Sequence, residues 1–545
     1  MERRKFFQSG SLAVIAGAIS PLGGCRPREG GISSQVKGAI EGNDNFVFNE
    51  VTVEDLQQKM EGGSETARSI AEAYLQRIAV IDQAGPELRA VIEINPQALQ
   101  IADELDRERA QGKLRGALHG IPVMIKDNID TGDQMQTTAG SLALVGWMAK
   151  QDSQVARKLR QAGALILGKT NLSEWANFRS FASSSGWSSR GGQTKNPYVL
   201  NRTPCGSSAG SAVAVAANLC ALAIGTETNG SVVCPSSMNG IVGIKPTVGL
   251  IGRSGIIPIS ETQDTAGSMA RTVRDAAILL AALSGVDEDD ARTLEGEGKS
   301  QQDYLPFLKK DGLEGARIGV GKGFMGFNGR VDQLMIEAFE WMEKQGAVLF
   351  EVEGTVAETG GGDSFTIMLY EFKEGLNRYL AECGEAVKVK SLAELIVFNK
   401  QNKQELMPFF QQEILEMAES KGDLQSEEYV TALQNSLKGA RQEGIDRVMD
   451  DLQLDAIVAP TGGPAWVTDL VFGDRKGGGG CSSAAARAGY PHVTVPMGRV
   501  HGLPVGISFF GRAWSEPLLL KLAYAYEQGT GERRAPGFRK RVGGN

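Results

Sequence analysis

The chain is best understood from two glycine-rich segments, Pro204-Cys-Gly-Ser-Ser-Ala-Gly-Ser211 and Gly225-Thr-Glu-Thr-Asn-Gly-Ser-Val-Val-Cys-Pro235. Their small residues place Ser207 and Ser231 in tight turns, which are typical of a close backbone approach or of an exposed nucleophile. Upstream, Lys126 follows a short apolar run that predicts a buried strand. Two such serines and a lysine withdrawn from water predict hydrolytic chemistry without a histidine.

Lys126 is the candidate base. A serine hydroxyl is a weak nucleophile, and a lysine can activate it only if burial lowers the pKa of the amine enough to keep it neutral. The apolar run Ile121-Pro-Val-Met-Ile125 should carry the lysine stem into a site that is screened from water. The alternative is a lysine whose amine reaches the surface at the end of a strand.

Short apolar runs alternate with helical patterns along the chain, which predicts a largely buried sheet with helices on both faces. Strands are predicted at residues 121–125, 164–167, 222–225, 456–459, 493–495 and 505–510, and helices at residues 154–162, 211–218 and 517–528. The region 301–436 has a more helical pattern. We interpret it as an insertion within one domain that covers residues 46–545.

Four further segments occur in the order found in the amidase signature family, which the chain resembles from about Glu50 to Gln528. They are Leu118-His-Gly-Ile-Pro-Val123, Gly168-Lys-Thr-Asn-Leu-Ser-Glu174, Gly243-Ile-Lys-Pro-Thr247 and Gln263-Asp-Thr-Ala-Gly267. The resemblance implies an α/β fold with a single large twisted mixed β-sheet and helices on both faces. It also implies an amidase, which hydrolyses linear amide C–N bonds.

The resemblance assigns roles to particular residues. It implies that Ser231 is the nucleophile, Ser207 the bridging serine and Lys126 the base, and that the reaction passes through an acyl-enzyme. It further implies a cis peptide bond between Gly206 and Ser207. The backbone N–H groups expected to stabilise the oxyanion are those of Thr228, Asn229, Gly230 and Ser231. No cofactor and no metal are implied.

Two residues depart from the common family pattern. Asn229 stands where most members have glycine, and Val233 stands where an arginine often follows the nucleophile. Asparagine tolerates left-handed backbone angles, so the turn should survive. Residues 226–235, 369–375 and 513–517 look closest to the peptide amidase branch. This likeness implies a small-molecule or peptide amide as substrate, with ammonia or an amine released, and favours the C-terminal carboxamide of peptides.

Two other functions remain open from the sequence. One is a glutamine amidotransferase subunit that passes ammonia to a tRNA-bound amino acid; the other is a catalytically silent, lipid-anchored binding protein. A Ser-His-Asp triad is a third alternative, since its members meet only in space, and His119 is then the candidate base. The histidines His119, His492 and His501 have no acidic residue at metal spacing, which argues against a zinc site.

Composition argues against some partners. The 545 residues include 57 basic and 65 acidic side chains, and the net charge of −8 gives no field that attracts a nucleic acid. The C-terminal basic residues Arg533, Arg534 and 539–541 are expected to form a solvated tail. Six cysteines become an odd five if Cys25 carries a lipid, so free buried thiols are expected rather than a disulfide framework.

The N-terminal residues predict export. Arg3-Arg4, followed by Phe6-Phe7 and a short apolar run, resembles a twin-arginine signal over residues 1–24, and Leu22-Gly-Gly-Cys25 resembles a lipoprotein box with Cys25 as the lipidation site. The alternative is a Sec-type signal with a chance cysteine. Residues 25–45 are predicted to be a flexible tether. We expect a periplasmic or cell-envelope protein that contacts the membrane only through this anchor. The sequence gives no indication of the oligomeric state.

Overall fold

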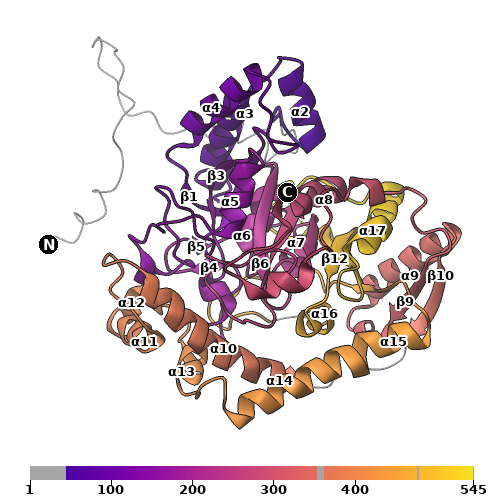
Figure 1. The fold of residues 1–545 in the computed structure, drawn as a ribbon. Coiled ribbons are helices and arrows are strands. Elements are labelled where there is room, and N and C mark those ends of the chain that lie inside the picture. Colours follow the sequence, from indigo (N-terminus) through magenta and orange to yellow (C-terminus); the bar gives the residue numbers. More distant parts are fainter. Residues whose placement is uncertain (1–44, 353–360, 476–477, 544–545) are drawn as a thin grey trace.

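Eleven strands form one mixed β-sheet in the part of the chain that the computed structural model describes, which is residues 45–352, 361–475 and 478–543 (Figure 1). The strand order across the sheet is β1-β3-β2-β6-β8-β7-β12-β13-β11-β9-β10. These strands are β1 (Val91–Ile94), β2 (Pro122–Lys126), β3 (Leu165–Thr170), β6 (Leu222–Glu227), β7 (Val242–Lys245), β8 (Thr265–Ala270), β9 (Arg317–Gly321), β10 (Val348–Val352), β11 (Ala456–Pro460), β12 (His492–Val500) and β13 (Leu503–Phe510). Two short strands, β4 (Trp187–Ser188) and β5 (Gly192–Gln193), pair with each other.

Helices pack around the sheet, which confirms the predicted fold class. The α-helices are α2 (Val53–Glu61), α3 (Ala67–Arg77), α4 (Ala98–Ala110), α5 (Gln154–Gln161), α6 (Ala209–Ala216), α7 (Val233–Met238), α8 (Val273–Leu283), α9 (Gly329–Lys344), α10 (Gly361–Glu382), α11 (Leu392–Gln401), α12 (Lys403–Leu406), α13 (Glu413–Glu419), α14 (Glu427–Ala440), α15 (Asp446–Asp451), α16 (Ser482–Ala488) and α17 (Glu516–Thr530). Among the described residues, no helix has both the length and the apolar character that a bilayer crossing requires.

The strands and helices predicted from the sequence are present with boundaries shifted by a few residues, but residues 301–436 differ from the expectation. Strands β9 and β10 lie in this region and extend the main sheet, with helix α9 between them. Strand β10 is an edge strand with several exposed positions, so its apolar signal in the sequence is weak. The helical part begins at α10, and α10 to α15 form an arc along the lower side of Figure 1.

The parallel pairing of β2 with β6 brings two functional segments to the same edge of the sheet. Met124 pairs with Ala223 and Ile125 with Ile224. Because parallel strands run in the same direction, their C-terminal ends lie together, so Lys126 at the end of β2 lies beside the turn that follows β6.

Helix α6 explains why the first glycine-rich segment contains such small residues. Every residue of Ala209–Ala216 is buried, so the helix is covered on all sides. A Cβ atom at Gly210 would lie 2.3 Å from the carbonyl oxygen of Ala90 and 2.4 Å from that of Asn171. Only glycine allows this approach of the helix to its neighbours, and the approach places the start of α6, at Ala209, two residues after Ser207.

The C-terminal segment is folded onto the domain, which corrects the expectation of a solvated basic tail. The side chain of Arg533 is only 14% exposed, and its guanidinium lies 2.8 Å from the carboxylate of Glu50. It also donates hydrogen bonds to the Tyr198 hydroxyl (2.7 Å) and to the carbonyl oxygen of Ala216 (2.9 Å). The sequence alone could not show this, because Glu50 and Tyr198 lie hundreds of residues away.

The predicted export signal (residues 1–24), the lipidation site Cys25 and the tether (residues 25–45, apart from residue 45 itself) lie outside the described residues.

We predict that Arg533→Ala lowers the free energy of unfolding by about 3 kcal/mol, near the lower end for a broken buried ion pair because Glu50 is partly exposed. Arg534→Ala is the matched control. Within the described residues, the exposed side chain of Arg534 forms hydrogen bonds only to the carbonyl oxygens of Gly531 and Arg533, so its effect should stay below about 0.5 kcal/mol. Urea unfolding of both variants measures the difference, and equal effects would contradict the packing described for Arg533.

Candidate active site

The amine of Lys126 lies in the protein interior and contacts one of the two predicted serines. Lys126 is 0% exposed, so the alternative of a surface lysine is wrong. Its Nζ atom lies 2.8 Å from Ser207 Oγ, 2.8 Å from Thr226 Oγ1 and 3.2 Å from the carbonyl oxygen of Thr226. The structure therefore brings Lys126 and Ser207 together as the sequence predicts, and it adds Thr226 as a second partner of the amine.

Burial changes the protonation of this lysine. Loss of water around the amine lowers the pKa of Lys126 to about 7, although the negative charges of Asp264 and Glu227 act in the opposite direction. A large fraction of the amine is therefore neutral at neutral pH, as a proton acceptor must be.

The Ser207 loop is held from several directions. The peptide bond between Gly206 and Ser207 is cis, as the family resemblance implies. The N–H group of Ser173 donates to the carbonyl oxygen of Ser207 (3.1 Å). The next residue, Ser208, donates from its N–H group to the carbonyl oxygen of Ser231 (3.1 Å), so the backbones of the two serine segments are joined.

Glu227 organises the turn that carries Ser231. Its buried carboxylate accepts hydrogen bonds from the N–H groups of Gly230 (2.7 Å), Val232 (2.7 Å) and Val233 (3.0 Å), which flank the serine on both sides. Ser231 itself is half-buried at the start of this turn. Among the described residues, its hydroxyl makes no hydrogen bond to Ser207.

One member of the predicted oxyanion hole is corrected by this arrangement. The N–H group of Gly230 is already bound to Glu227, so it does not point to a substrate oxygen. The N–H groups of Thr228, Asn229 and Ser231 have no acceptor within the described part of the chain. These three are the remaining candidate donors.

The side chains of the same turn are fixed on two sides. Asn229 Oδ1 accepts a hydrogen bond from Ser482 Oγ (2.8 Å), and its Nδ2 donates to Ser483 Oγ (3.1 Å), so its amide is directed to the start of α16. The hydroxyl of Thr228 donates to Asp264 Oδ1 (2.5 Å). Asn229 therefore anchors this turn to a neighbouring helix.

Cys205 and Cys234 form a disulfide, which corrects the expectation of free thiols at these positions. The two cysteines are 29 residues apart, and they meet because the Ser207 loop packs against α7. Cys220, Cys383 and Cys481 are free and buried, as expected. The disulfide joins the segment before Ser207 covalently to the helix after Ser231. The odd cysteine count could not show this, since pairing depends on which segments meet in space.

The histidines do not support a Ser-His-Asp triad. His119 is buried, with Nε2 2.9 Å from the carbonyl oxygen of Leu105 and Nδ1 3.3 Å from the N–H group of Arg115, and neither residue belongs to the site. His492 lies beside Ser508 on neighbouring strands (2.6 Å). In the described residues, no group of three or more His, Cys, Asp or Glu side chains is placed to hold a metal ion.

Glu227, Asp264 and Asn128 were not identified as site residues from the sequence. All three lie in or beside the segments that led to the candidate residues. Asn128 is two residues after Lys126, Glu227 is four residues before Ser231, and Asp264 follows Gln263 in the segment that ends at Gly267. Asn128 Nδ2 donates to Thr226 Oγ1 (3.1 Å), next to the lysine amine. The signal was their position beside the catalytic candidates, but their roles depend on contacts that only the fold creates.

Comparison with known proteins identifies the family of this chain. The family model described as Amidase matches residues 69–520. The chain is similar to the native peptide amidase from Stenotrophomonas maltophilia, with 49% identity, a TM-score of 0.85, and coverage of 90% of this chain and 99% of that chain. It is 40% identical to a probable amidase of Arabidopsis thaliana over 91% of this chain and 93% of the relative. It is 31% identical to a glutamyl-tRNA(Gln) amidotransferase subunit of Acinetobacter baumannii over 88% of this chain and 96% of that relative. The chain therefore belongs to the Amidase family, also called the amidase signature family, and is an enzyme that hydrolyses the C–N bond of amides.

Proposed function

We propose that this amidase transfers the acyl group of its substrate to Ser231, with Ser207 passing the proton to Lys126. The observation that carries the proposal is the 2.8 Å contact between the buried amine of Lys126 and Ser207 Oγ. A neutral lysine at this distance can accept the hydroxyl proton of Ser207, which in turn can accept the proton of Ser231.

Thr226 orients the amine for this transfer. A neutral amine has two N–H groups and one lone pair. The carbonyl oxygen of Thr226 can only accept a hydrogen bond, and Thr226 Oγ1 lies at the same distance from Nζ as Ser207 Oγ. When both N–H groups are directed to Thr226, the lone pair faces Ser207.

In the proposed reaction, Ser231 Oγ attacks the carbonyl carbon of the amide. The N–H groups of Thr228, Asn229 and Ser231 stabilise the negative oxygen of the tetrahedral intermediate. The proton then returns from Lys126 through Ser207 to the nitrogen, the C–N bond breaks, and ammonia or an amine departs. Water repeats the same sequence on the acyl-enzyme and releases the carboxylic acid.

We propose the C-terminal carboxamide of peptides as the preferred substrate. The similarity to the Stenotrophomonas maltophilia peptide amidase over nearly the whole of that chain supports this choice. The amidotransferase subunit is less similar, and the predicted export of this chain would separate it from aminoacyl-tRNA. The close contact of Lys126 with Ser207 argues against a catalytically silent binding protein.

Ser231→Ala should abolish amide hydrolysis without unfolding the protein, and Ser207→Ala should reduce kcat by about 10²–10⁴-fold because the proton route is broken. Ser236→Ala is the matched control. Ser236 is buried on α7, and its hydroxyl has no partner among the described residues, so activity should be retained. Ammonia release measures turnover, and a fluorophosphonate probe should label the wild type and Ser236→Ala normally, Ser207→Ala more slowly, and Ser231→Ala not at all. Near-normal turnover by Ser207→Ala would refute the relay.

The activity should depend on pH through Lys126. Below the lysine pKa of about 7 the amine is protonated and cannot accept a proton, so kcat/KM should fall about tenfold for each further pH unit. The Lys126→Arg variant should be inactive at every pH up to about 9, because the arginine guanidinium stays charged and cannot accept a proton. Profiles of kcat/KM against pH with one uncharged peptide amide test this. A rate that is unchanged between pH 7 and pH 5 would contradict lysine as the base.

A comparison of substrates separates hydrolase from amidotransferase. The purified chain alone should release ammonia from a blocked dipeptide amide in amounts equal to the peptide acid formed. Free glutamine should be a poorer substrate by about 10–200-fold in kcat/KM. A preference for glutamine, or activity only after addition of a partner subunit, would favour the amidotransferase function.

A further inference from the structure

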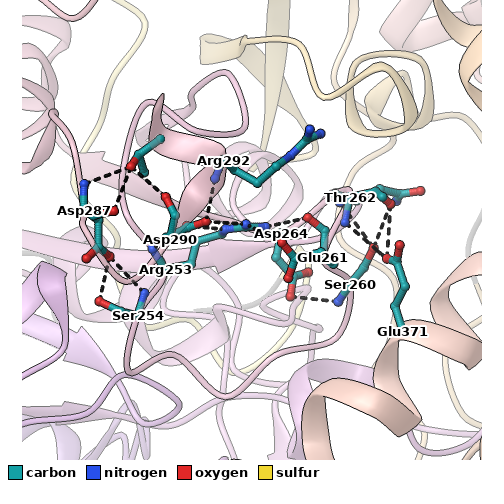
Figure 2. Close-up of polar contacts among 12 residues, drawn as sticks. Arg253, Ser254, Ser260, Glu261, Thr262, Asp264, Asp287, Asp290, Arg292 and Glu371 are labelled. Atoms are coloured by element: carbon teal, nitrogen blue, oxygen red, sulfur yellow. Dashed lines mark hydrogen bonds and ion pairs between the residues drawn. The ribbon is translucent and has the colours of Figure 1, made fainter. Parts of the chain in front are cut away.

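Helix α10 presents one buried carboxylate to the loop that precedes β8 (Figure 2). Glu371 is 3% exposed, and its Oε2 atom accepts hydrogen bonds from Ser260 Oγ (2.5 Å), Thr262 Oγ1 (3.1 Å) and the N–H group of Thr262 (3.2 Å). Its Oε1 atom accepts a hydrogen bond from the hydroxyl of Tyr429 on α14 (2.8 Å). Burial raises the pKa of Glu371, and the hydrogen bonds to its oxygens act in the opposite direction. Four donors around two oxygens suit the ionised form, which can only accept.

The same face of α10 approaches this loop at a second point. Gly375 follows Glu371 by four residues, so the two lie on one side of the helix. A Cβ atom at Gly375 would lie 2.8 Å from Cγ of Pro258, so this approach requires glycine. Both residues belong to segment 369–375, which resembles the peptide amidase branch and to which the proposed reaction assigns no role. The close packing indicates that this segment holds the loop in place.

Ser260 connects Glu371 to the end of the loop. Because an ionised carboxylate can only accept, the Ser260 hydroxyl donates to it, and the hydroxyl oxygen accepts the N–H group of Gln263 (3.2 Å). The N–H group of Ser260 donates to Asp264 Oδ2 (2.9 Å). Glu371 therefore fixes the direction of a hydroxyl group that holds residues 260–264 in a turn.

The end of the loop contacts the segment that carries Ser231. Asp264 Oδ1 accepts the hydroxyl of Thr228 (2.5 Å), and Gln263 Nε2 donates to the carbonyl oxygen of Thr228 (3.3 Å). Ser364, also on α10, donates to Gln263 Oε1 (2.8 Å). The loop thus holds both the side chain and the backbone of Thr228, whose N–H group is a candidate oxyanion donor.

The start of the loop is anchored to another part of the chain (Figure 2). Arg253 donates two hydrogen bonds to Asp290, of 2.7 Å from Nε and 2.8 Å from Nη2. Ser254 Oγ donates to Asp287 (2.6 Å). Both aspartates lie in the segment that follows α8. The start of the loop is therefore held by this segment, whereas its end, which contacts Thr228, is held by α10.

The loop also faces the catalytic groups. Ser260 and Asp264 line a cavity of about 850 Å³, which Asn128 and Thr226 line as well, beside the amine of Lys126. A displacement of residues 260–264 would therefore change the surroundings of the catalytic groups as well as the position of the turn that carries the nucleophile.

Building on the function proposed above, we propose that Glu371 is a positioning residue for amide hydrolysis, which acts through residues 260–264 to keep the N–H group of Thr228 where the oxyanion forms. An error of about 1 Å in the placement of such a group can cost about 10²-fold in rate. The oxyanion exists only after attack by Ser231. The loss of this positioning should therefore lower kcat and leave KM nearly unchanged.

The test compares Glu371→Ala with Glu371→Gln. The alanine variant loses every contact of the carboxylate, and its kcat for a blocked peptide carboxamide should fall about 10–100-fold, with less than about a twofold change in KM. The glutamine variant should keep kcat within about fivefold, since its oxygen can accept from Ser260 and Thr262 while its N–H group donates to the Tyr429 hydroxyl. Each kcat is taken per Ser231 labelled to completion by a fluorophosphonate, so misfolded protein is not counted.

Tyr370→Phe is the matched control. Tyr370 of α10 donates to Glu428 of α14 (2.6 Å), so this variant removes a tyrosine–glutamate hydrogen bond between the same two helices that Tyr429 and Glu371 join. It should leave kcat unchanged. Equal losses of kcat in Tyr370→Phe and Glu371→Ala would show that general packing of α10 is responsible, and would overturn the positioning role.

A double-mutant cycle tests the route to the turn. Thr228→Val removes the hydroxyl that binds Asp264 and should itself lower kcat. In that background Glu371→Ala should cost less than about threefold, because the contact through which it acts is already broken. The same loss in both backgrounds would contradict this route. A raised KM with an unchanged kcat would place Glu371 in substrate binding instead and would also overturn the proposal.

Two further results separate the possible failures. If Glu371→Ala does not fold, Ser260→Ala breaks the same route and should lower kcat about tenfold, and an unchanged kcat would refute the positioning role. A normal kcat in Glu371→Ala, with Ser231→Ala inactive, would refute this role alone and leave the proposed function intact. Hydrolysis by Ser231→Ala would refute the proposed function itself.

Discussion

The burial of one amine constrains much of this structure. A lysine that is fully withdrawn from water needs polar contacts, and Lys126 finds them in Ser207 and in two atoms of Thr226. The same burial lowers the pKa of the amine to about 7, which makes it able to accept a proton. The sheet positions the lysine, because the parallel pairing of β2 with β6 places Lys126 beside the segment that leads to Ser231.

Two buried carboxylates limit the lowering of the Lys126 pKa and also position neighbouring parts of the chain. Glu227 and Asp264 both raise the pKa of Lys126, against the larger effect of burial. Glu227 binds three N–H groups around Ser231, and Asp264 binds the hydroxyl of Thr228. Each carboxylate therefore combines an electrostatic role with a positioning role. Charge and geometry in the site are set by the same residues.

The turn that carries Ser231 is fixed from several independent directions. Asn229 joins it to α16, Ser208 joins it to the Ser207 loop, and the disulfide joins the same loop to α7. The loop that ends at Asp264 connects it further to α10 through Ser260 and Glu371. In the reaction we propose, such a framework would hold the N–H donors in place before the oxyanion forms, which is the condition for strong stabilisation of a transition state. It also leaves a preformed cavity on the side of Lys126.

The sequence by itself determined the family, the α/β fold class, and the two residues Lys126 and Ser207 that the structure brings into contact. It could do so because tight turns and a lysine after a buried strand leave local patterns of glycine, serine and apolar residues. Only the tertiary structure decided that Asn229 is bound to Ser482 and Ser483, that Cys205 and Cys234 are paired, and that Arg533 is bound to Glu50. The cavity beside Asn128 also belongs to this second group. The physical reason is that these features arise where side chains from separate segments meet, and a local pattern holds no information on which segments those are.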